Sequence, residues 1–212
     1  MWVLGAAGLA AASFWETKPF TDWSAAEVEQ MLTDSPWAKK MSVVVPIPPR
    51  AADTNAIAGR GGRSDDGLGR GFPVPAPQLK LVISWRSALP VRQALMRLPN
   101  GATNAGVDQV PLAERPPYYM ITLSGVPSRY ARATASAGTT TFLRRGRKPP
   151  IPLEQGGMQE GGATLTLVFA FPRTDPITLD DKEVEFVTTI GTLEIKKKFT
   201  LKDLVFNGEL EL

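Results

Sequence analysis

EVEFVTTIGTLEIKKKFTL, residues 183–201, is the stretch of sequence that decides the fold. Apolar and polar residues alternate on both sides of Gly191-Thr192, a pattern that predicts two strands joined in a β-hairpin. One face of this hairpin is apolar, and the other carries glutamate, lysine and threonine. Such alternation is typical of an antiparallel sheet with one solvated face. The residues expected on the apolar face are Val184, Phe186, Thr188, Ile190, Leu193, Ile195, Phe199 and Leu201.

Further strands are expected on both sides of this hairpin. The strongest β signal is ATLTLVFAF at 163–171, and two weaker signals lie at 80–86 and 118–123. In each segment, apolar side chains recur at every second position, which indicates a strand with one buried face. Near the end of the chain, Asn207-Gly208 predicts a tight turn between two short strands.

Two short helices are also expected. Ser24 and Glu27 form a capping box, and Trp23 and Val28 occupy the two positions of a hydrophobic staple. The second helix begins near Pro90, a residue type that suits the first helical turn. Two helices are too few to cover the sheet completely. The predicted fold class is therefore α+β, strand-dominated and mainly antiparallel, with two or three short helices on one face and long Gly/Pro loops.

Glycine and proline cluster in three stretches, 46–78, 99–117 and 144–162. Segments of this kind have little apolar surface to offset the entropy lost on ordering. We therefore predict one domain, residues 15–212, that carries three flexible loops. Residues 1–14 are apolar and end in small residues, as an export signal does, but they lack its basic start. They are either a residual signal segment, which implies a periplasmic or extracellular location, or an apolar element packed on the domain.

The sequence contains no cysteine and no histidine. Cys-His and Ser-His nucleophile systems, disulfides and zinc sites of the Cys/His type are therefore excluded. The acidic group Asp175, Asp180, Asp181 and Glu183 matches no EF-hand spacing and is explained by turn formation. We predict no catalytic residue, no cofactor and no metal. A net charge of +3 does not require a nucleic acid partner, and residues 1–14 are too short to span a membrane.

Three of the five tryptophans, Trp15, Trp23 and Trp37, surround the first helix. A short helix is marginal by itself and needs tertiary contacts, so we expect these indoles to fasten an N-terminal arm to the sheet. The alternative is that one or two of them, Trp37 above all, face outward and contact a partner or a glycan.

Trp85 and Arg86 end a predicted strand just before a helix. At this place the pattern is consistent both with a ligand site and with a core position.

A compact basic run, RRGRK, occupies residues 144–148. Arg144, Arg145, Arg147 and Lys148 would suit a phosphate-bearing surface if they formed one contiguous positive face. The alternative is a solvated loop.

Two stretches carry a resemblance to a known group of proteins. They are WETKPFTDWSAAEVEQMLTDSPWAK at 15–39 together with SWRSALPVRQAL at 84–95, and FTLKDLVFNGELEL at 199–212. The chain resembles uncharacterised exported proteins of acidobacteria, which place a similar tryptophan-bearing helix after a signal peptide and end in a similar segment. The resemblance implies export but no activity, and it transfers no catalytic residue.

Three hypotheses of function remain. The first is a non-catalytic exported domain that acts through protein or surface interaction, and it predicts an exposed apolar or aromatic patch. The second is a carboxylate-based hydrolase of glycans or esters, which requires two acids with perturbed pKa values in a deep pocket. The third is a polyanion binder that uses the basic run. The sequence favours the first and leaves the partner and the oligomeric state open.

Overall fold

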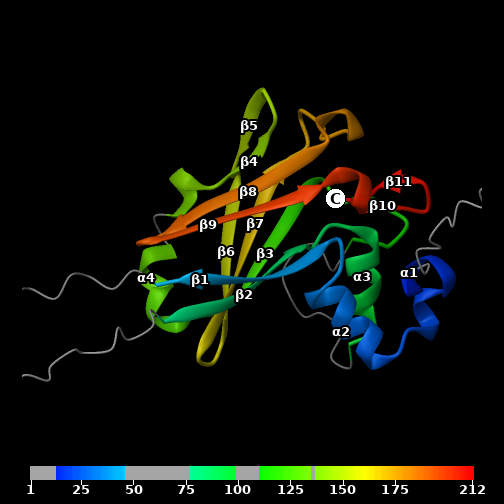
Figure 1. The fold of residues 1–212 in the computed structure, drawn as a ribbon, viewed down its shortest axis with the longest axis horizontal. Coiled ribbons are helices and arrows are strands. Elements are labelled where there is room, and N and C mark those ends of the chain that lie inside the picture. The colour runs from blue at the N-terminus through cyan, green and yellow to red at the C-terminus, as the bar shows by residue number, and fades with distance from the viewer. Residues whose placement is uncertain (1–12, 46–76, 99–109, 135–136) are drawn as a thin grey trace, which may run out of the picture.

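The computed structural model describes residues 13–45, 77–98, 110–134 and 137–212. Two antiparallel sheets dominate it, so the α+β, strand-dominated class is confirmed. The five-stranded sheet has the order β1-β2-β3-β7-β6 and the four-stranded sheet the order β5-β4-β8-β9 (Figure 1). The strands of the first sheet are β1 (Ala38–Val44), β2 (Gln78–Trp85), β3 (Tyr118–Pro127), β7 (Thr164–Pro172) and β6 (Gln155–Gly161). Those of the second are β5 (Lys148–Pro152), β4 (Phe142–Arg145), β8 (Glu183–Ile190) and β9 (Leu193–Thr200).

The apolar faces of the two sheets pack against each other. The rings of Phe169 and Phe186 lie 5.2 Å apart, and those of Trp85 and Phe199 lie 5.7 Å apart. Each pair joins one sheet to the other, so the interior is a sandwich core of interdigitated side chains. The helices expected on one face of the sheet are not what covers it, because a second sheet packs on the apolar face.

Four short α-helices lie at the two ends of this sandwich (Figure 1). At one end, α2 packs on α3 and on the strands β1 and β2, with α1 beside them, while α4 lies at the other end. Among the described residues, no helix is long and apolar enough to span a bilayer. The helices are α1 (Phe14–Thr17), α2 (Ala25–Thr33), α3 (Leu89–Met96) and α4 (Ala131–Thr134). Short 3₁₀ turns occupy Phe20–Asp22, Ser128–Tyr130, Ala137–Thr140, Leu179–Asp181 and Leu201–Leu204.

The predicted start of α2 is confirmed in detail. Ser24 is the N-cap, its hydroxyl accepts from the backbone N–H of Glu27, and the Glu27 carboxylate accepts from the Ser24 N–H at 2.8 Å. Trp23 and Val28, the two staple residues, are both buried. The predicted C-terminal pair is also present, as β10 (Val205–Phe206) and β11 (Glu209–Leu210) with Asn207 at positive φ in the turn.

The prediction of a loop over 144–162 is wrong. This stretch contributes the end of β4 and the whole of β5 and β6. For β5 the error has a physical reason: it is an outermost strand, and such a strand tolerates proline because one side of its backbone needs no ladder partner. β6 is also outermost and pairs with β7 although it contains three glycines. Most of the predicted loops at 46–78 and 99–117, namely 46–76 and 99–109, lies outside the described residues.

The tryptophans act as internal fasteners. Trp23 and Trp37 are buried, and Trp15, half-buried in α1, meets Trp37 edge to face with 6.0 Å between centroids. Phe14 contacts Trp23 in the same way at 5.3 Å, so the folded part includes Phe14 as well as the expected residues from Trp15 onward. Residues 1–12 of the expected signal segment lie outside the described residues. The structure thus confirms that aromatic side chains anchor the N-terminal arm.

Candidate functional site

Two of the proposed partner contacts are core residues. Trp37 and Trp85 are both 0% exposed, so neither reaches a partner, and that interpretation is corrected. Their sequence context could not separate burial from exposure, because an indole at a strand end suits both. Arg86 follows β2 and is half-buried.

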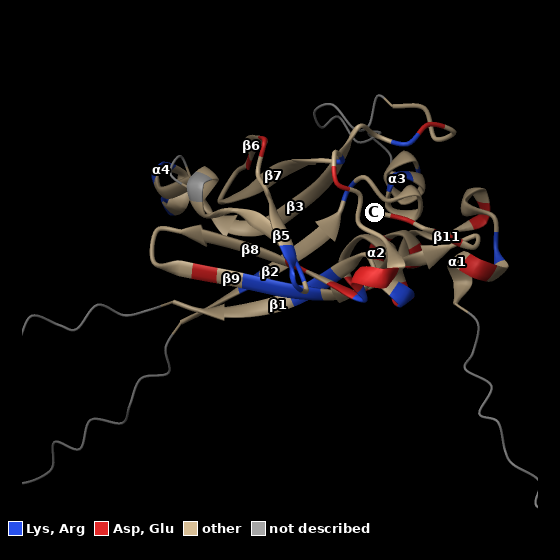
Figure 2. Ribbon diagram, turned by 90° about the horizontal axis from the view of Figure 1, so that it is seen from above, with Lys and Arg blue, Asp and Glu red and all other residues tan. Residues whose placement is uncertain are grey.

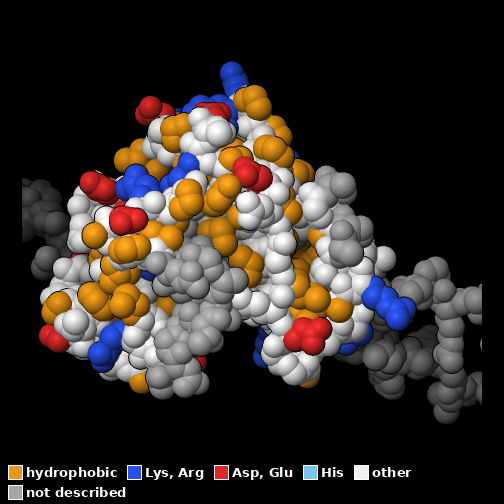
Figure 3. All heavy atoms as spheres, turned by 180° about the vertical axis from the view of Figure 1, so that it is seen from behind, with side chains coloured by type: hydrophobic (Ala, Val, Ile, Leu, Met, Phe, Trp, Pro, Cys, Tyr) orange, Lys and Arg blue, Asp and Glu red, His pale blue; other side chains and the backbone are white. Residues whose placement is uncertain are grey.

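The basic run does not form one positive face. Residues 144 and 145 are consecutive in β4, so their side chains point to opposite faces of the sheet. Arg144 is exposed and its Nε donates to Oε2 of Glu185 at 2.9 Å, whereas Arg145 is 1% exposed. Lys148 pairs with Asp181 at 2.7 Å, and Arg147 is exposed in the turn. On the face shown in Figure 3, blue and red side chains lie close together and no block of blue forms.

Arg145 has a structural role. Its Nη2 donates to Oδ2 of Asp175 at 2.5 Å and to the carbonyl of Pro149 at 3.2 Å, and its Nη1 donates to the carbonyl of Asp175 at 3.2 Å. The Arg145 hydrogen bond lowers the pKa of Asp175. This buried guanidinium therefore ties the turn between β4 and β5 to the loop after β7.

The other acids of the predicted cluster are also used in pairs. Asp181 accepts from the backbone N–H of Thr178 at 3.0 Å, and Glu183 pairs with Lys198 at 2.8 Å. Burial opposes ionisation of Asp181, but the hydrogen bonds from Lys148 and Thr178 prevail and lower its pKa. In the described ranges, no group of three or more potential ligand side chains is placed to hold a metal ion.

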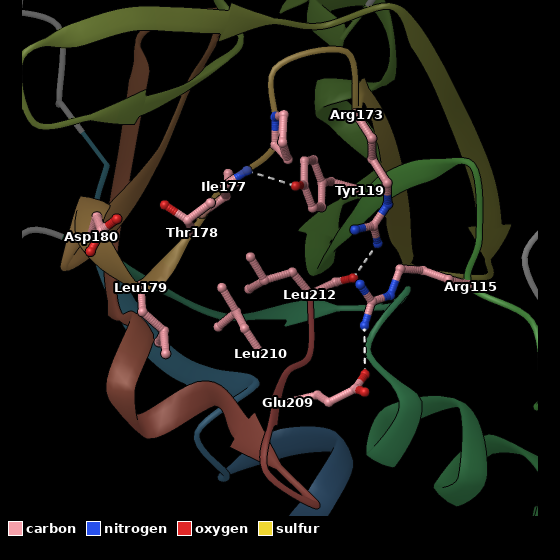
Figure 4. Close-up of a pocket in the computed structure, with 11 residues that line it drawn as sticks. Arg115, Tyr119, Arg173, Ile177, Thr178, Leu179, Asp180, Glu209, Leu210 and Leu212 are labelled. Atoms are coloured by element: carbon pink, nitrogen blue, oxygen red, sulfur yellow. Dashed lines mark hydrogen bonds and ion pairs between the residues drawn. The ribbon is translucent and has the colours of Figure 1, made fainter.

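A cavity of about 670 Å³ opens beside the C-terminal strands (Figure 4). Three segments that are distant in sequence line it: the approach to β3, the loop between β7 and β8, and β11 with the residues after it. Its lining residues are Arg115, Tyr119, Arg173, Pro176, Ile177, Thr178, Leu179, Asp180, Glu209, Leu210 and Leu212. Five of these residues, Pro176, Ile177, Leu179, Leu210 and Leu212, form an aliphatic part of the wall, and two guanidinium groups lie together at one side of the cavity.

Tyr119 forms the rigid back of this cavity. Its hydroxyl accepts from the backbone N–H of Ile177 at 2.8 Å, and its ring meets Trp85 edge to face at 6.2 Å. The guanidinium carbon of Arg173 lies 3.9 Å from the centroid of the Tyr119 ring, a cation–π distance. Trp85 therefore supports the cavity from behind, although it does not line it.

Arg173 is held in a partly desolvated position. Its Nη2 donates to the carbonyl of Leu212, and its Nε is buried without a hydrogen-bond partner in the described part of the chain. Burial lowers the pKa of Arg173; the electrostatic influence of Tyr119 opposes the shift, and the nearby positive charge of Arg115 adds to it. A carboxylate placed between the two guanidiniums would relieve this repulsion.

Arg115 is the exchangeable cation of the cavity. Its side chain is 53% exposed, and its Nη2 lies 3.1 Å from Oε2 of Glu209 and 3.4 Å from Oε1 of Glu211. Exposed ion pairs of this kind contribute only about 0–1 kcal/mol. An incoming carboxylate can therefore replace Glu209 at little cost. The carbonyl of Glu211 is fixed from behind by the indole N–H of Trp37 at 2.9 Å.

Two further features mark the loop between β7 and β8 as unusual. Leu179 is 51% exposed although it lines an aliphatic wall. Lys182, just after the 3₁₀ turn, has a φ of 62°, which is the left-handed region that residues other than glycine rarely adopt. Backbone strain that the surrounding structure maintains is often found at functional sites. Both observations point to the same loop.

The two acids of the cavity do not form a pair. Asp180 and Glu209 both line the cavity, but Figure 4 shows them on opposite sides with Leu179 and Leu210 between them. A general acid needs a raised pKa. The described carboxyl groups whose pKa departs from its ordinary value, Glu27, Asp175 and Asp181, all shift downward.

Sequence reasoning identified none of the lining residues as a site. Arg115 and Arg173 stand in no motif, and only the fold brings them together. The two tryptophans that it did select, Trp37 and Trp85, contact the wall from the core side. Comparison of the chain with protein-family models, with curated proteins and with solved structures finds no match, so its function rests on this geometry alone.

Proposed function

We propose that the chain is an exported, non-catalytic interaction domain whose cavity binds a partner polypeptide through an apolar side chain next to a carboxylate. The observation that carries the proposal is the exposed ion pair of Arg115, placed beside an aliphatic wall. The carboxylate of the partner would displace Glu209 and lie between Arg115 and Arg173. Its apolar neighbour would cover Leu179 and Leu210.

The charge balance of the cavity argues for a polypeptide rather than a polyanion. Arg115 and Arg173 are countered by Asp180 and Glu209 in the same lining, so repeated negative charge would meet two carboxylates. The basic run that a polyanion would use is divided between two faces and neutralised by Glu185, Asp175 and Asp181. Export is supported by the apolar N-terminal segment and by the sequence resemblance described above.

Calorimetric titration with three capped dipeptides tests the proposed function. N-acetyl-Leu-Asp-amide carries both groups, N-acetyl-Leu-Asn-amide lacks the charge, and N-acetyl-Gly-Asp-amide lacks the apolar side chain. We expect the first to bind at least tenfold more tightly than the other two, because each of them leaves one half of the cavity unsatisfied. Arg115→Gln should remove the preference for the charged probe.

The matched control is Arg147→Gln, which deletes an exposed arginine that does not line the cavity. It should leave all three affinities within about twofold of the wild type. Equal affinity for the three probes, the absence of binding at millimolar concentration, or an equal effect of both substitutions would refute the proposed cavity.

A further inference from the structure

The four outermost strands of the two sheets are not equivalent. β1 and β6 end the five-stranded sheet, and β5 and β9 end the four-stranded sheet. An outermost strand presents unpaired backbone groups, and proteins usually block it with lysine, proline or inward-pointing charge. Two of these strands in the described chain carry inward lysine and a third carries proline, whereas the fourth, β6, has neither and has Glu160, opposite Leu165 near its end, as its inward charge.

β1 and β9 are blocked by lysine. Lys39 is paired with Ile83 and Lys197 with Phe186, so each half-buried lysine lies on the inner face of its outermost strand. In the ribbon of Figure 2, several Lys and Arg positions are blue along β9. β5 is blocked differently, because three of its five residues are proline, in the sequence KPPIP.

β6, with the sequence QGGMQEG, contains neither lysine nor proline. Its central Met158 is 42% exposed. A β-carbon built on Gly156 would lie 3.6 Å from Leu153, and one on Gly157 would lie 3.9 Å from Val168, both ordinary contacts. The packing of this chain therefore does not require glycine at either position. Glycine inside a strand often marks a place where another backbone approaches closely.

An apolar groove of about 580 Å³ runs beside β6. Gly156 and Met158 face it from β6, opposite Phe169 and Leu167 of β7. α4 forms the other bank, where the Thr134 hydroxyl contacts the sulfur of Met158 at 3.7 Å. The remaining lining residues include Ala131, Ala137 and Leu153, so the groove is suited to aliphatic side chains.

We propose that the outer edge of β6 binds an extended polypeptide segment of another protein, which adds a strand to the five-stranded sheet. Backbone hydrogen bonds to β6 supply affinity, and alternate apolar side chains of the segment enter the groove between β6 and α4. Glu154 and Glu160 stand at the two ends of β6. They favour a segment with basic residues on both sides of its apolar positions.

The size of the edge favours a peptide over a second copy of the chain. Seven residues span about 23 Å at ~3.3 Å per residue. A stable dimer needs about 1,200 Å² or more of buried surface, and two paired edges of this length offer one strand contact only. A peptide that lies in the groove is covered on a second side by α4. This surface is separate from the cavity of the proposed function.

Selection from a phage-displayed library of random dodecapeptides tests the inference, with the full chain as bait and Met158→Lys as counter-bait. The substitution gives β6 the inward lysine that β1 and β9 carry. We expect the enriched peptides to alternate apolar and polar residues with basic ends. Synthetic versions should bind at least tenfold more weakly to Met158→Lys, and about equally to Met158→Leu.

Backbone pairing is tested by N-methylation of alternate amides of an enriched peptide. Methylation of one of the two alternate sets should weaken binding at least tenfold, and methylation of the other should have little effect. Val44→Lys, on the opposite edge of the same sheet, is the matched control and should leave affinity within twofold. If Met158→Lys unfolds the chain, Gly156→Val, which fills the groove, replaces it.

Three outcomes would overturn the inference. The first is no enrichment over the counter-bait. The second is a peptide whose binding tolerates methylation of both amide sets. The third is a concentration-dependent dimer in sedimentation that Met158→Lys abolishes, because this assigns the edge of β6 to self-pairing.

Discussion

Two arginine-bearing regions of this molecule use the same side chain in opposite ways. In the β4–β5 hairpin, Arg145 is 1% exposed and is bound to Asp175 and to two backbone carbonyls. In the cavity beside β11, Arg115 is 53% exposed and is held only by the carboxylates of Glu209 and Glu211. The first region is conspicuous in the sequence as RRGRK, and the second leaves no local trace.

The difference teaches that the density of charge in a sequence is a poor guide to a binding site. Strand alternation separates neighbouring cations, and three of the four in this run, Arg144, Arg145 and Lys148, have their own carboxylate, so most of a dense run becomes part of the framework. A site needs a charge whose present partner can be exchanged. Exposed pairs satisfy this condition because they contribute about 0–1 kcal/mol, whereas removal of one partner from a buried pair costs about 3–5 kcal/mol.

Loss of the buried arginine should have the largest effect. Arg145→Met keeps most of the side-chain volume but removes the bonds to Asp175 and Pro149. We expect the free energy of unfolding to fall by about 3 kcal/mol, measured by urea denaturation, because the carbonyls of Pro149 and Asp175 lose their donor, while the Asp175 side chain is 59% exposed and stays solvated. Arg147→Met, in the same turn and exposed, is the control and should change it by less than ~0.5 kcal/mol. Equal effects of the two substitutions would remove the distinction between framework and surface arginines.

A substitution on the core side of the cavity should have the second-largest effect on stability. Trp37→Phe deletes the indole N–H that donates to the carbonyl of Glu211 and reduces the buried volume. One lost buried hydrogen bond plus a small cavity should cost about 2 kcal/mol of unfolding free energy. Leu98→Ala, a partly exposed side chain after α3, is expected to cost less than ~1 kcal/mol. A loss below that of Leu98→Ala would show that Trp37 is not a fastener.

Removal of the Glu209 carboxylate, which competes for Arg115, should strengthen binding of the charged probe. Glu209→Gln frees Arg115 of one of its two acids. N-acetyl-Leu-Asp-amide should then bind about two- to fivefold more tightly, the equivalent of a surface pair of about 0.5–1 kcal/mol. Stability should change by less than ~1 kcal/mol. Weaker binding after this substitution would mean that Glu209 contacts the ligand itself.

Acidification should have a graded and smaller effect on stability. The pKa of Glu27 is lowered to about 2, by the hydrogen bond of Lys18 and then by the Ser24 backbone, and the pKa values of Asp175 and Asp181 are also lowered. Stability from groups with a lowered folded-state pKa is fully present above the ordinary carboxyl pKa of about 4 and is lost as pH falls through the folded values.

The melting temperature should therefore be level above about pH 5 and decline between about pH 4 and pH 2. Glu27→Gln should decline less over this range, because one of the three titrating groups is gone. A melting temperature that rises on acidification would contradict the sign of all three shifts.

Much of the fold follows from the sequence. Alternation predicted β2, β7, β8 and β9, and the capping box predicted the start of α2, because in each case the signal lies within one element. The loop predicted over 144–162 failed because composition says nothing about where a strand lies in a sheet, and outermost strands accept proline. The second sheet was missed for a related reason: an apolar face in the sequence does not indicate whether a helix or another sheet will cover it.

The cavity could not be predicted from the sequence, because no single helix, strand or loop contains its lining residues. Tyr119 belongs to a buried strand, Arg173 follows another, and Leu210 ends the chain's last strand pair. Each residue has an ordinary local context, and only long-range packing brings the three together. The tryptophans show the same limit, since the sequence pattern left both a core role and a partner contact open for Trp37 and Trp85, and only the core role is found.

The central claim is that exposed, exchangeable Arg115, and not the dense basic run, binds the carboxylate of a partner. Isotope-edited NMR of the ¹⁵N-labelled chain during titration with N-acetyl-Leu-Asp-amide tests it most directly. The account predicts saturable shifts of the Arg115 Nε–H and of the backbone amides of Ile177 and Leu210, while Arg144 and Arg147 stay unchanged. Shifts confined to the β4–β5 hairpin, or no saturable shift at the cavity, would contradict it.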